Sequence, residues 1–331
     1  MKRTTRALLA LALTAGLAGT LLTPASAAAP EDLLLGELSR GAAPTVPHVE
    51  GDVLVDGTLR LDLPKRVGRY LGRQGDDYLL WVYARIDGPD RIVRLSPDGS
   101  REVVVEGRSL YDATLSEDGS SMASSLTSSS RRTTVKVYDL ITGALTHKRT
   151  VPGYGGVLDY DGDRVAIGLN NPWETVVWTT DTDSVFLVVG RGGSRADLSL
   201  DLLATVTKDP YRGGCTVVTT FSDPATELWR SCRERVEDFS TDGSRIATVD
   251  LLADGLGPGR VWLRRTGGRL LEQYDAPYHF GTVGFEDATD LLMNTYGRTK
   301  SAIVRCDGAT CERASRIRGY NPPLRAARPQ L

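Results

Sequence analysis

Short apolar runs separated by tight turns fill most of the chain. In three clear copies, a hydrophobic residue and a few further residues lead to an Asp-Gly turn, which a short apolar run follows. These turns are Asp118-Gly119, Asp161-Gly162 and Asp242-Gly243, with weaker copies near Gly75, Leu202 and Thr289. Successive turns are 40 to 46 residues apart. Asp-Gly suits such positions because both residues tolerate positive φ, so each turn predicts a hairpin.

A second series of turns lies between the first, 19 to 24 residues after each partner. Its members are Gly99, Gly143, Asp183, Pro224, Gly267 and Gly308. Two interleaved series with one period predict four strands per repeat. Four short strands every 40 to 46 residues are typical of a β-propeller blade. We therefore predict an all-β fold with a single β-propeller.

The number of blades depends on the ends of the chain. Six complete blades fit residues 66–318, and the hairpin at 52–63 has the phase of the two outer strands of a further blade. Residues 45–49 are a candidate for one more strand there. We expect residues 320–327 to return as the innermost strand, so that both termini share a seventh blade and no edge stays open. The alternative is six blades with the hairpin packed against the ring.

The repeats resemble those of a known group of proteins. The resemblance rests on Leu95-Ser96-Pro97-Asp98-Gly99-Ser100-Arg101 and on Phe239-Ser-Thr-Asp-Gly-Ser-Arg-Ile-Ala247. These segments are similar to the Ser-Pro-Asp-Gly-x-x-Ile-Ala units of TolB-type, WD-repeat-like β-propellers. The layout is similar to secreted actinobacterial proteins of that group, most of which lack an assigned activity. The resemblance thus implies a fold and a compartment but no reaction.

The N-terminus reads as an export signal. Lys2, Arg3 and Arg6 precede an apolar run over residues 7–22, and Ala25-Ser26-Ala27 supplies small residues for cleavage. A retained membrane anchor is the alternative, but the run is short and contains two glycines. We divide the chain into a signal peptide at 1–27, an N-terminal extension at 28–44 and the β-propeller at 45–331. In the extension we expect one or two helical turns lying against the ring.

The four cysteines fit a secreted protein. Folding the two hairpins symmetrically places Cys215 opposite Cys232 and Cys306 opposite Cys311. Residues that face each other on antiparallel strands are close enough to bridge, so we predict these two disulfides. A zinc site is the alternative, but the spacings do not fit one and no histidine lies near either pair.

Composition narrows the class of partner. The chain has 40 Lys and Arg against 42 Asp and Glu, and removal of the signal peptide would leave 37 against 42. A net charge of about −5 argues against nucleic acid and against anionic membranes as partners. No other stretch approaches the 18 apolar residues of a membrane span, so we expect a soluble mature protein, and a monomer.

Catalytic patterns are weak. The three histidines, His48, His147 and His279, fall in different repeats, and Ser194 lacks the last Gly of a nucleophile elbow. We therefore predict no catalytic residues, no metal ligands and no cofactor. One alternative stays open: a Ca²⁺ ion held by scattered carboxylates in the central channel, as in lactonase-like propellers, which would make the protein a metal-dependent hydrolase.

Longer loops gather on one face of the predicted ring, opposite the Asp-Gly turns. Aromatic and arginine side chains on such loops are typical of binding surfaces. The candidates are Tyr154, Trp173, Tyr211, Arg212, Tyr278 and His279. We predict a secreted, non-catalytic propeller that binds an extracellular protein, a cell-wall glycan or a small ligand on this face. The alternative for these aromatics is that they fold down and cover the ends of the blades.

Overall fold

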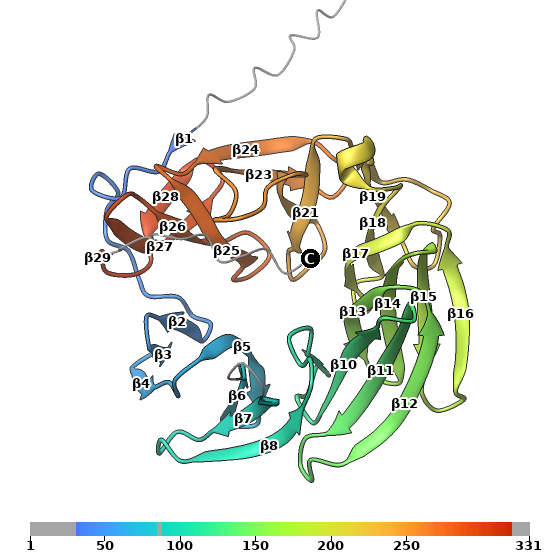
Figure 1. The fold of residues 1–331 in the computed structure, drawn as a ribbon. Helices are drawn as coiled ribbons and strands as arrows, with labels where there is room; N and C mark the ends of the chain where they lie inside the picture. The colour runs from blue at the N-terminus through green and yellow to red at the C-terminus, as the bar shows by residue number, and fades with distance from the viewer. Residues whose placement is uncertain (1–30, 85–87, 320–331) are drawn as a thin grey trace, which may run out of the picture.

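The computed structural model describes residues 31–84 and 88–319. Those residues form seven sheets, antiparallel apart from one added parallel strand, which are arranged around a common axis, with the chain passing from one sheet to the next (Figure 1). The fold is therefore the predicted all-β propeller with seven blades. The six-bladed alternative is wrong, because residues 48–62 form a separate sheet instead of a hairpin packed against a sixth blade.

Six of the blades contain four consecutive strands in the order of the chain, and two of these sheets gain a short fifth strand. The first two comprise β5 (Val67–Gln74), β6 (Asp77–Val82), β7 (Asp90–Leu95) and β8 (Arg101–Gly107), then β9 (Thr114–Leu115), β10 (Ser121–Ser128), β11 (Arg132–Asp139) and β12 (Leu145–Pro152). The next two comprise β13 (Gly155–Asp161), β14 (Arg164–Asn170), β15 (Trp173–Thr179) and β16 (Ser184–Val189), then β17 (Gly192–Asp197), β18 (Leu202–Val206), β19 (Thr216–Thr220) and β20 (Trp229–Ser231). The last two comprise β21 (Glu234–Phe239), β22 (Arg245–Asp250), β23 (Arg260–Arg265) and β24 (Leu270–Asp275), then β25 (His279–Phe285), β26 (Leu291–Tyr296), β27 (Lys300–Asp307) and β28 (Thr310–Arg313).

The turns of the sequence repeat connect the strands as predicted. The first series joins the innermost strand of each blade to the second, and the second series joins the third strand to the outermost. Gly119, Gly162 and Gly243 adopt φ values of 67°, 58° and 69°. At Gly119 a Cβ atom would also lie 1.9 Å from the carbonyl oxygen of Arg73 in the preceding blade. Glycine is thus needed there both for the backbone angle and for the close approach of two blades.

Apolar side chains fill the spaces between neighbouring blades. Between the second and third blades, for example, Val137, Ile167 and Trp178 belong to one buried cluster. Trp81 and Trp229 pack against two further clusters of this kind, as expected for strand tryptophans. Each blade therefore buries both faces of its sheet, which explains strands rich in Val, Leu and Ala.

The seventh sheet consists of β2 (His48–Glu50), β3 (Val53–Asp56) and β4 (Leu59–Asp62). Its two outer strands are the hairpin predicted from the sequence, and β2 is the extra strand, at 48–50 where residues 45–49 were the candidate. The segment 320–327, predicted to be the innermost strand, lies outside the described residues, so its place stays a prediction. The two residues before it, Arg318–Gly319, form β29 and pair with β27 of the sixth blade.

The N-terminal extension is a strap along the outside of the ring. Its first strand, β1 (Glu31–Asp32), pairs in parallel with β24, and further along Arg313 of β28 donates its backbone N–H to the carbonyl oxygen of Ser39 at 2.8 Å. One helical turn, closed by the Leu38 N–H on the Leu34 carbonyl at 3.3 Å, agrees with the expectation. The strap therefore spans two outer edges before the chain enters the seventh sheet.

Both predicted disulfides are present. Cys215–Cys232 joins the β19–β20 hairpin, and Cys306–Cys311 joins directly opposed residues of β27 and β28. The Cα atoms of the two pairs are 4.0 and 4.2 Å apart. In the part of the chain that the structure describes, no helix is long and apolar enough to cross a bilayer. The predicted signal peptide at 1–27 lies outside that part.

Candidate functional site

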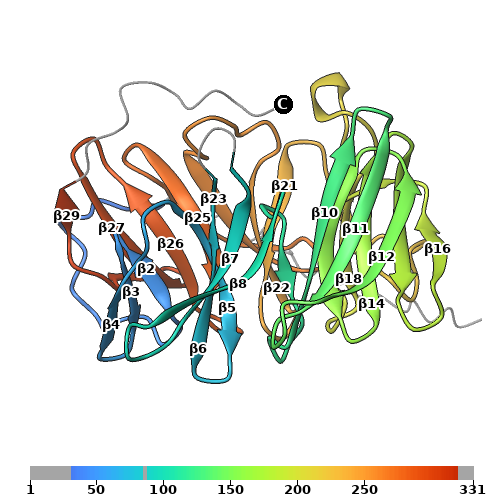
Figure 2. The same cartoon turned by 60° about the horizontal axis from the view of Figure 1, so that its bottom comes forward.

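The ring has two different faces. The turn face carries the two series of hairpin turns, such as the β5–β6 turn at the bottom of Figure 2. The loop face carries the connections from second to third strands and from one blade to the next, including the short 3₁₀ helix η1 (Pro210–Arg212) at the top of the same view. All six predicted binding residues lie at the loop face, because each falls in or beside such a connection.

Exposed tyrosines are concentrated on the loop face. Among the described residues, all five tyrosines with large exposure lie in its connections: Tyr83, Tyr111, Tyr154, Tyr211 and Tyr278, which are 47%, 56%, 38%, 69% and 42% exposed. They come from five different connections and so are spread around the ring. A tyrosine offers a large apolar surface with a polar tip, which suits a contact surface that stays wet until a partner covers it.

Tyr211 and Arg212 are presented by η1. The carboxylate of Asp209 caps this helix by accepting the Tyr211 N–H at 3.0 Å. The Tyr211 hydroxyl donates to the carboxylate of Asp254, in a loop of the next blade, at 2.8 Å, and this bond raises the pKa of the phenol. Arg212 lies 3.6 Å from Asp209, and its side chain is 85% exposed. This pair is thus held from two loops while both side chains remain open to solvent.

Tyr278 and His279 differ in exposure although they are neighbours. His279 is buried; its ring stacks on Tyr296 at 4.7 Å between centroids and meets Tyr278 edge-on at 5.0 Å. Burial lowers the pKa of His279, which favours the neutral imidazole. His279 therefore supports Tyr278 from below, and Tyr278 is the member of the pair that a partner can reach.

Tyr154 and Trp173 lie on the third blade, where the backbone N–H of Asn170 donates to the Tyr154 carbonyl at 2.7 Å. Trp173 is half-buried and covers Gly192, at which a Cβ atom would lie 2.6 Å from the indole. Trp173 and His279 thus fold down and cover the ends of the blades, which was the alternative interpretation of these aromatics. Tyr154, Tyr211 and Tyr278 stay exposed. Sequence reasoning missed the exposed pair Leu252 and Leu256, although the run of Gly and Pro before Arg260 marks their loop.

Carboxylates on the innermost strands, or just before them, connect neighbouring blades. Each accepts a backbone N–H from the blade that follows. The pairs are Asp112–Val157, Asp159–Leu198 and Asp238–Phe285, with O···N distances of 3.2, 2.7 and 3.0 Å. Burial raises the pKa of Asp112 and of Asp159. Arg195 of β17 reaches Asp238 of the next blade at 2.8 Å. These acids therefore hold the ring together.

The alternative of a metal-dependent hydrolase finds no support. Within residues 31–84 and 88–319, no three His, Cys, Asp or Glu side chains are grouped as metal ligands. The innermost carboxylates are bonded to backbone N–H groups or to arginine instead. Ser194, considered as a nucleophile, donates its hydroxyl to the carbonyl oxygen of Ala204 at 3.2 Å.

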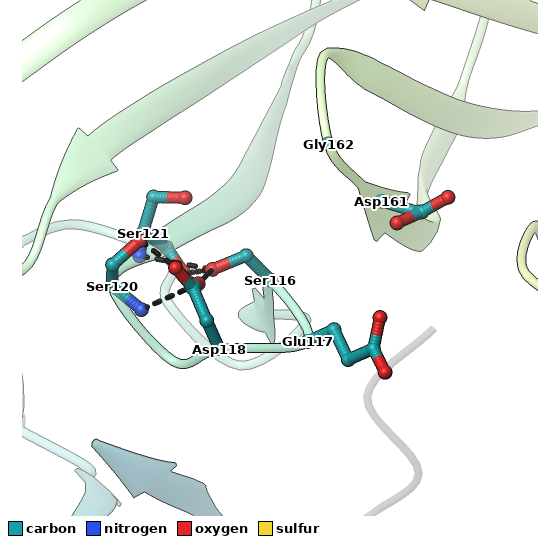
Figure 3. A pocket seen from close by; sticks show the side chains of 7 residues that line it. All are labelled: Ser116, Glu117, Asp118, Ser120, Ser121, Asp161 and Gly162. Atoms are coloured by element: carbon teal, nitrogen blue, oxygen red, sulfur yellow. Dashed lines mark hydrogen bonds between the residues drawn. The ribbon is translucent and has the colours of Figure 1, made fainter. Parts of the chain in front are cut away.

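A hollow of about 540 Å³ lies on the turn face between the Asp-Gly turns of the second and third blades. Figure 3 shows Asp118 bent back into its own turn, where it accepts hydrogen bonds from Ser116 and Ser120 at 2.7 and 3.0 Å. Asp161, across the hollow, pairs with Arg164 at 2.9 Å. Two of the carboxylates around this hollow are therefore already engaged in the structure of the turns.

Comparisons with known proteins agree with the fold. No family model and no curated protein matches the sequence. An uncharacterised protein of Listeria monocytogenes matches with a TM-score of 0.50 and 16% identity, over 78% of this chain and 84% of that one. The acylaminoacyl peptidase of Pyrococcus horikoshii matches with a TM-score of 0.56 and 10% identity, over 80% of this chain and 47% of that one. TolB of Acinetobacter baumannii matches with a TM-score of 0.47 and 13% identity, over 67% of this chain and 62% of that one.

At such identities the first two matches show the fold alone. This chain spans about half the length of the peptidase, so no peptidase activity follows for it. A propeller with a disulfide in each of two hairpins is consistent with an extracellular protein, because disulfides persist in oxidising compartments.

Proposed function

We propose that this protein is an extracellular, non-catalytic propeller whose loop face binds another protein. The observation that supports this most strongly is the placement of the five exposed tyrosines. Tyrosine and arginine are enriched in protein interfaces relative to the rest of the protein surface. Among the residues described, the turn face carries no exposed tyrosine.

The spread of these tyrosines favours a large partner. They arise from five connections around the ring, so that one small ligand would touch few of them. A standard protein interface covers about 800 Å² on each partner, which suits an extended face. A cell-wall glycan, which the sequence left as another partner, would use aromatic side chains in a more compact group.

The experiment compares the wild type with the triple variant Tyr154→Ala, Tyr211→Ala, Tyr278→Ala. The control is Ile141→Ala, because Ile141 is 70% exposed in a hairpin turn of the opposite face. Each immobilised protein is exposed to culture supernatant of the source organism, and captured proteins are quantified by mass spectrometry. A parallel arm measures co-sedimentation with purified, protein-free cell wall.

We expect the wild type and the control to enrich the same protein and the triple variant to lose it by about tenfold or more. Equal capture by the triple variant would show that the loop face is not the interface. Co-sedimentation with cell wall that depends on the three tyrosines, without a captured protein, would assign the face to a glycan instead. Thermal melting of all three proteins checks that the substitutions leave the fold intact.

A further inference from the structure

The outermost strand of the third blade, β16, has an unusual sequence. It reads Ser184-Val-Phe-Leu-Val-Val189, without a charged residue or a proline. Val185 packs toward the second blade and Val188 and Val189 toward the fourth. Phe186 and Leu187, however, are 49% and 58% exposed. Within the described part of the chain, β16 pairs with β15 alone, so its outer edge offers free backbone donors and acceptors.

The other outermost strands are protected in ways that β16 is not. β8, β12, β20 and β28 each carry charged side chains, with the sequences Arg-Glu-Val-Val-Val-Glu-Gly, Leu-Thr-His-Lys-Arg-Thr-Val-Pro, Trp-Arg-Ser and Thr-Cys-Glu-Arg. β24 is covered by the strap strand β1. Proteins guard strand edges by charge or by a cover, because an open apolar edge invites another strand. β16 has neither protection, which marks it as an edge meant to be paired.

The charges at the two ends of β16 indicate the direction of pairing. Asp181 and Asp183 precede the strand, and Arg191 follows it. Asp183 already binds Arg149 at 2.8 Å, and Arg191 is half-buried and donates to the Thr205 hydroxyl and the Pro224 carbonyl oxygen at 3.0 and 3.1 Å, whereas Asp181 is exposed. A second identical strand placed antiparallel would bring the acidic end of each copy to the basic end of the other. A parallel arrangement would instead place the acidic ends together, which repulsion disfavours.

We propose that β16 is a dimerisation edge, at which a second copy of this chain adds its own β16 in antiparallel orientation. A two-fold axis through residue 186 places Phe186 of the two copies opposite each other and sets Asp181 of each copy opposite Arg191 of the other, since directly opposed residues of an antiparallel pair must share one face of the sheet. The two four-stranded blades then become one eight-stranded sheet. The contact is self-complementary and closes after two copies, as a two-fold interface does. It departs from the monomer expected from sequence, and it leaves the loop face free for a different partner.

The test uses Leu187→Lys and the matched control Val103→Lys. Val103 is 48% exposed on β8, the outermost strand of the first blade, so both changes add a lysine to an exposed position on an outer edge. Sedimentation equilibrium over a series of concentrations measures the dimer dissociation constant. We expect the wild type and Val103→Lys to dimerise equally and Leu187→Lys to weaken the dimer by about 100-fold, because the charge would be buried without a partner.

A second variant tests the pairing direction, and a second measurement locates the contact. Asp181→Arg places like charges opposite each other and should weaken the dimer, with a loss that diminishes at high salt. In hydrogen exchange, the amides of residues 184–189 should gain protection as the wild type dimerises, while those of β8 do not change. A wild type that stays monomeric throughout the series overturns the proposal. A dimer unaffected by Leu187→Lys, or open-ended aggregates in place of a dimer, overturns it as well.

Discussion

At the scale of single residues, one carboxylate organises each of the turns Asp118-Gly119 and Asp242-Gly243. In the Ser240-Thr-Asp-Gly-Ser244 turn, the Asp242 carboxylate accepts the Ser240 hydroxyl at 2.7 Å and the Ser244 N–H at 3.0 Å. These bonds favour the charged carboxylate and lower the pKa of Asp242 to about 2. Asp118 is bonded in the same way, and its pKa is lowered too. In these two copies the sequence repeat is therefore a repeated local hydrogen-bond pattern, whereas Asp161 in the third copy pairs with Arg164.

Because of these hydrogen bonds, the free energy of unfolding should decrease as the pH falls below the ordinary pKa of aspartate. The folded pKa of Asp242 lies below its ordinary value of 3.8, so its contribution is present above that value and is lost as the pH falls toward about 2. We expect Asp242→Ala to lower the free energy of unfolding by about 1 kcal/mol at neutral pH, a typical value for lost turn hydrogen bonds. Urea unfolding at several pH values measures it. The difference from wild type should shrink toward pH 2, whereas Ile141→Ala, at a position 70% exposed, removes no titratable group and should show no such pH-dependent loss. An Asp242→Ala difference that is constant with pH would contradict this account.

The sequence located the candidate face but not the exposure of each side chain on it. Tyr211 falls in a loop of this face and Trp173 at the first strand residue after one, yet Tyr211 is exposed and Trp173 covers Gly192. That difference depends on a glycine in the next blade, which no local pattern in the loop records. The sequence could therefore identify the loops that form a surface, while tertiary packing decides which aromatics a partner can reach.

At the scale of elements, the N-terminal strap covers the outer edges of the fifth and sixth blades. Leu33 is fully buried in the cluster that lies between the fifth and sixth blades, whereas its neighbour Leu34 is 44% exposed. The end of the strap is held by Glu286, which accepts the Thr45 hydroxyl at 2.8 Å and binds Arg305 at 2.6 Å. The strap is thus packed as part of the core.

The two leucines give a matched pair of variants for the strap. Leu33→Ala removes a buried side chain and should lower the free energy of unfolding by about 2–5 kcal/mol. Leu34→Ala removes an exposed one and should change it by about 0.5 kcal/mol or less. Chemical denaturation of both variants measures the difference. Equal effects would mean that the strap does not contribute to the core in solution.

The sequence predicted the blades well because their turns are local. An Asp-Gly dipeptide between apolar runs specifies a hairpin within a few residues, and the period then follows. The partners of the strap could not be predicted in this way, since β1 pairs with residues near 274, far along the chain. A segment of a few residues has no repeat in its sequence that would reveal so distant a partner strand. The sequence therefore predicted that the extension lies against the ring, but not which strands it contacts.

At the scale of the whole molecule, the remaining question is how the ring closes at the seventh blade. Its sheet has three strands where the other blades have four, and β2 is the strand on which an innermost strand would add. Arg318 already reaches this strand, with its guanidinium bonded to the Glu50 carbonyl oxygen at 2.7 Å. The segment 320–327, which the sequence predicts to add to β2, begins two residues after Arg318.

Truncation of the C-terminus tests that prediction. Deletion of residues 320–331 should expose the edge of β2 and lower the melting temperature by several degrees, because a propeller closed at every blade has no open edge near its axis. Deletion of 328–331 alone is the control and should leave the melting temperature unchanged. Hydrogen exchange of the His48–Glu50 amides distinguishes the outcomes: faster exchange in the long deletion alone places the strand on β2. Unchanged exchange and melting in both deletions would mean that the N-terminal strap and the three-stranded sheet close the ring by themselves.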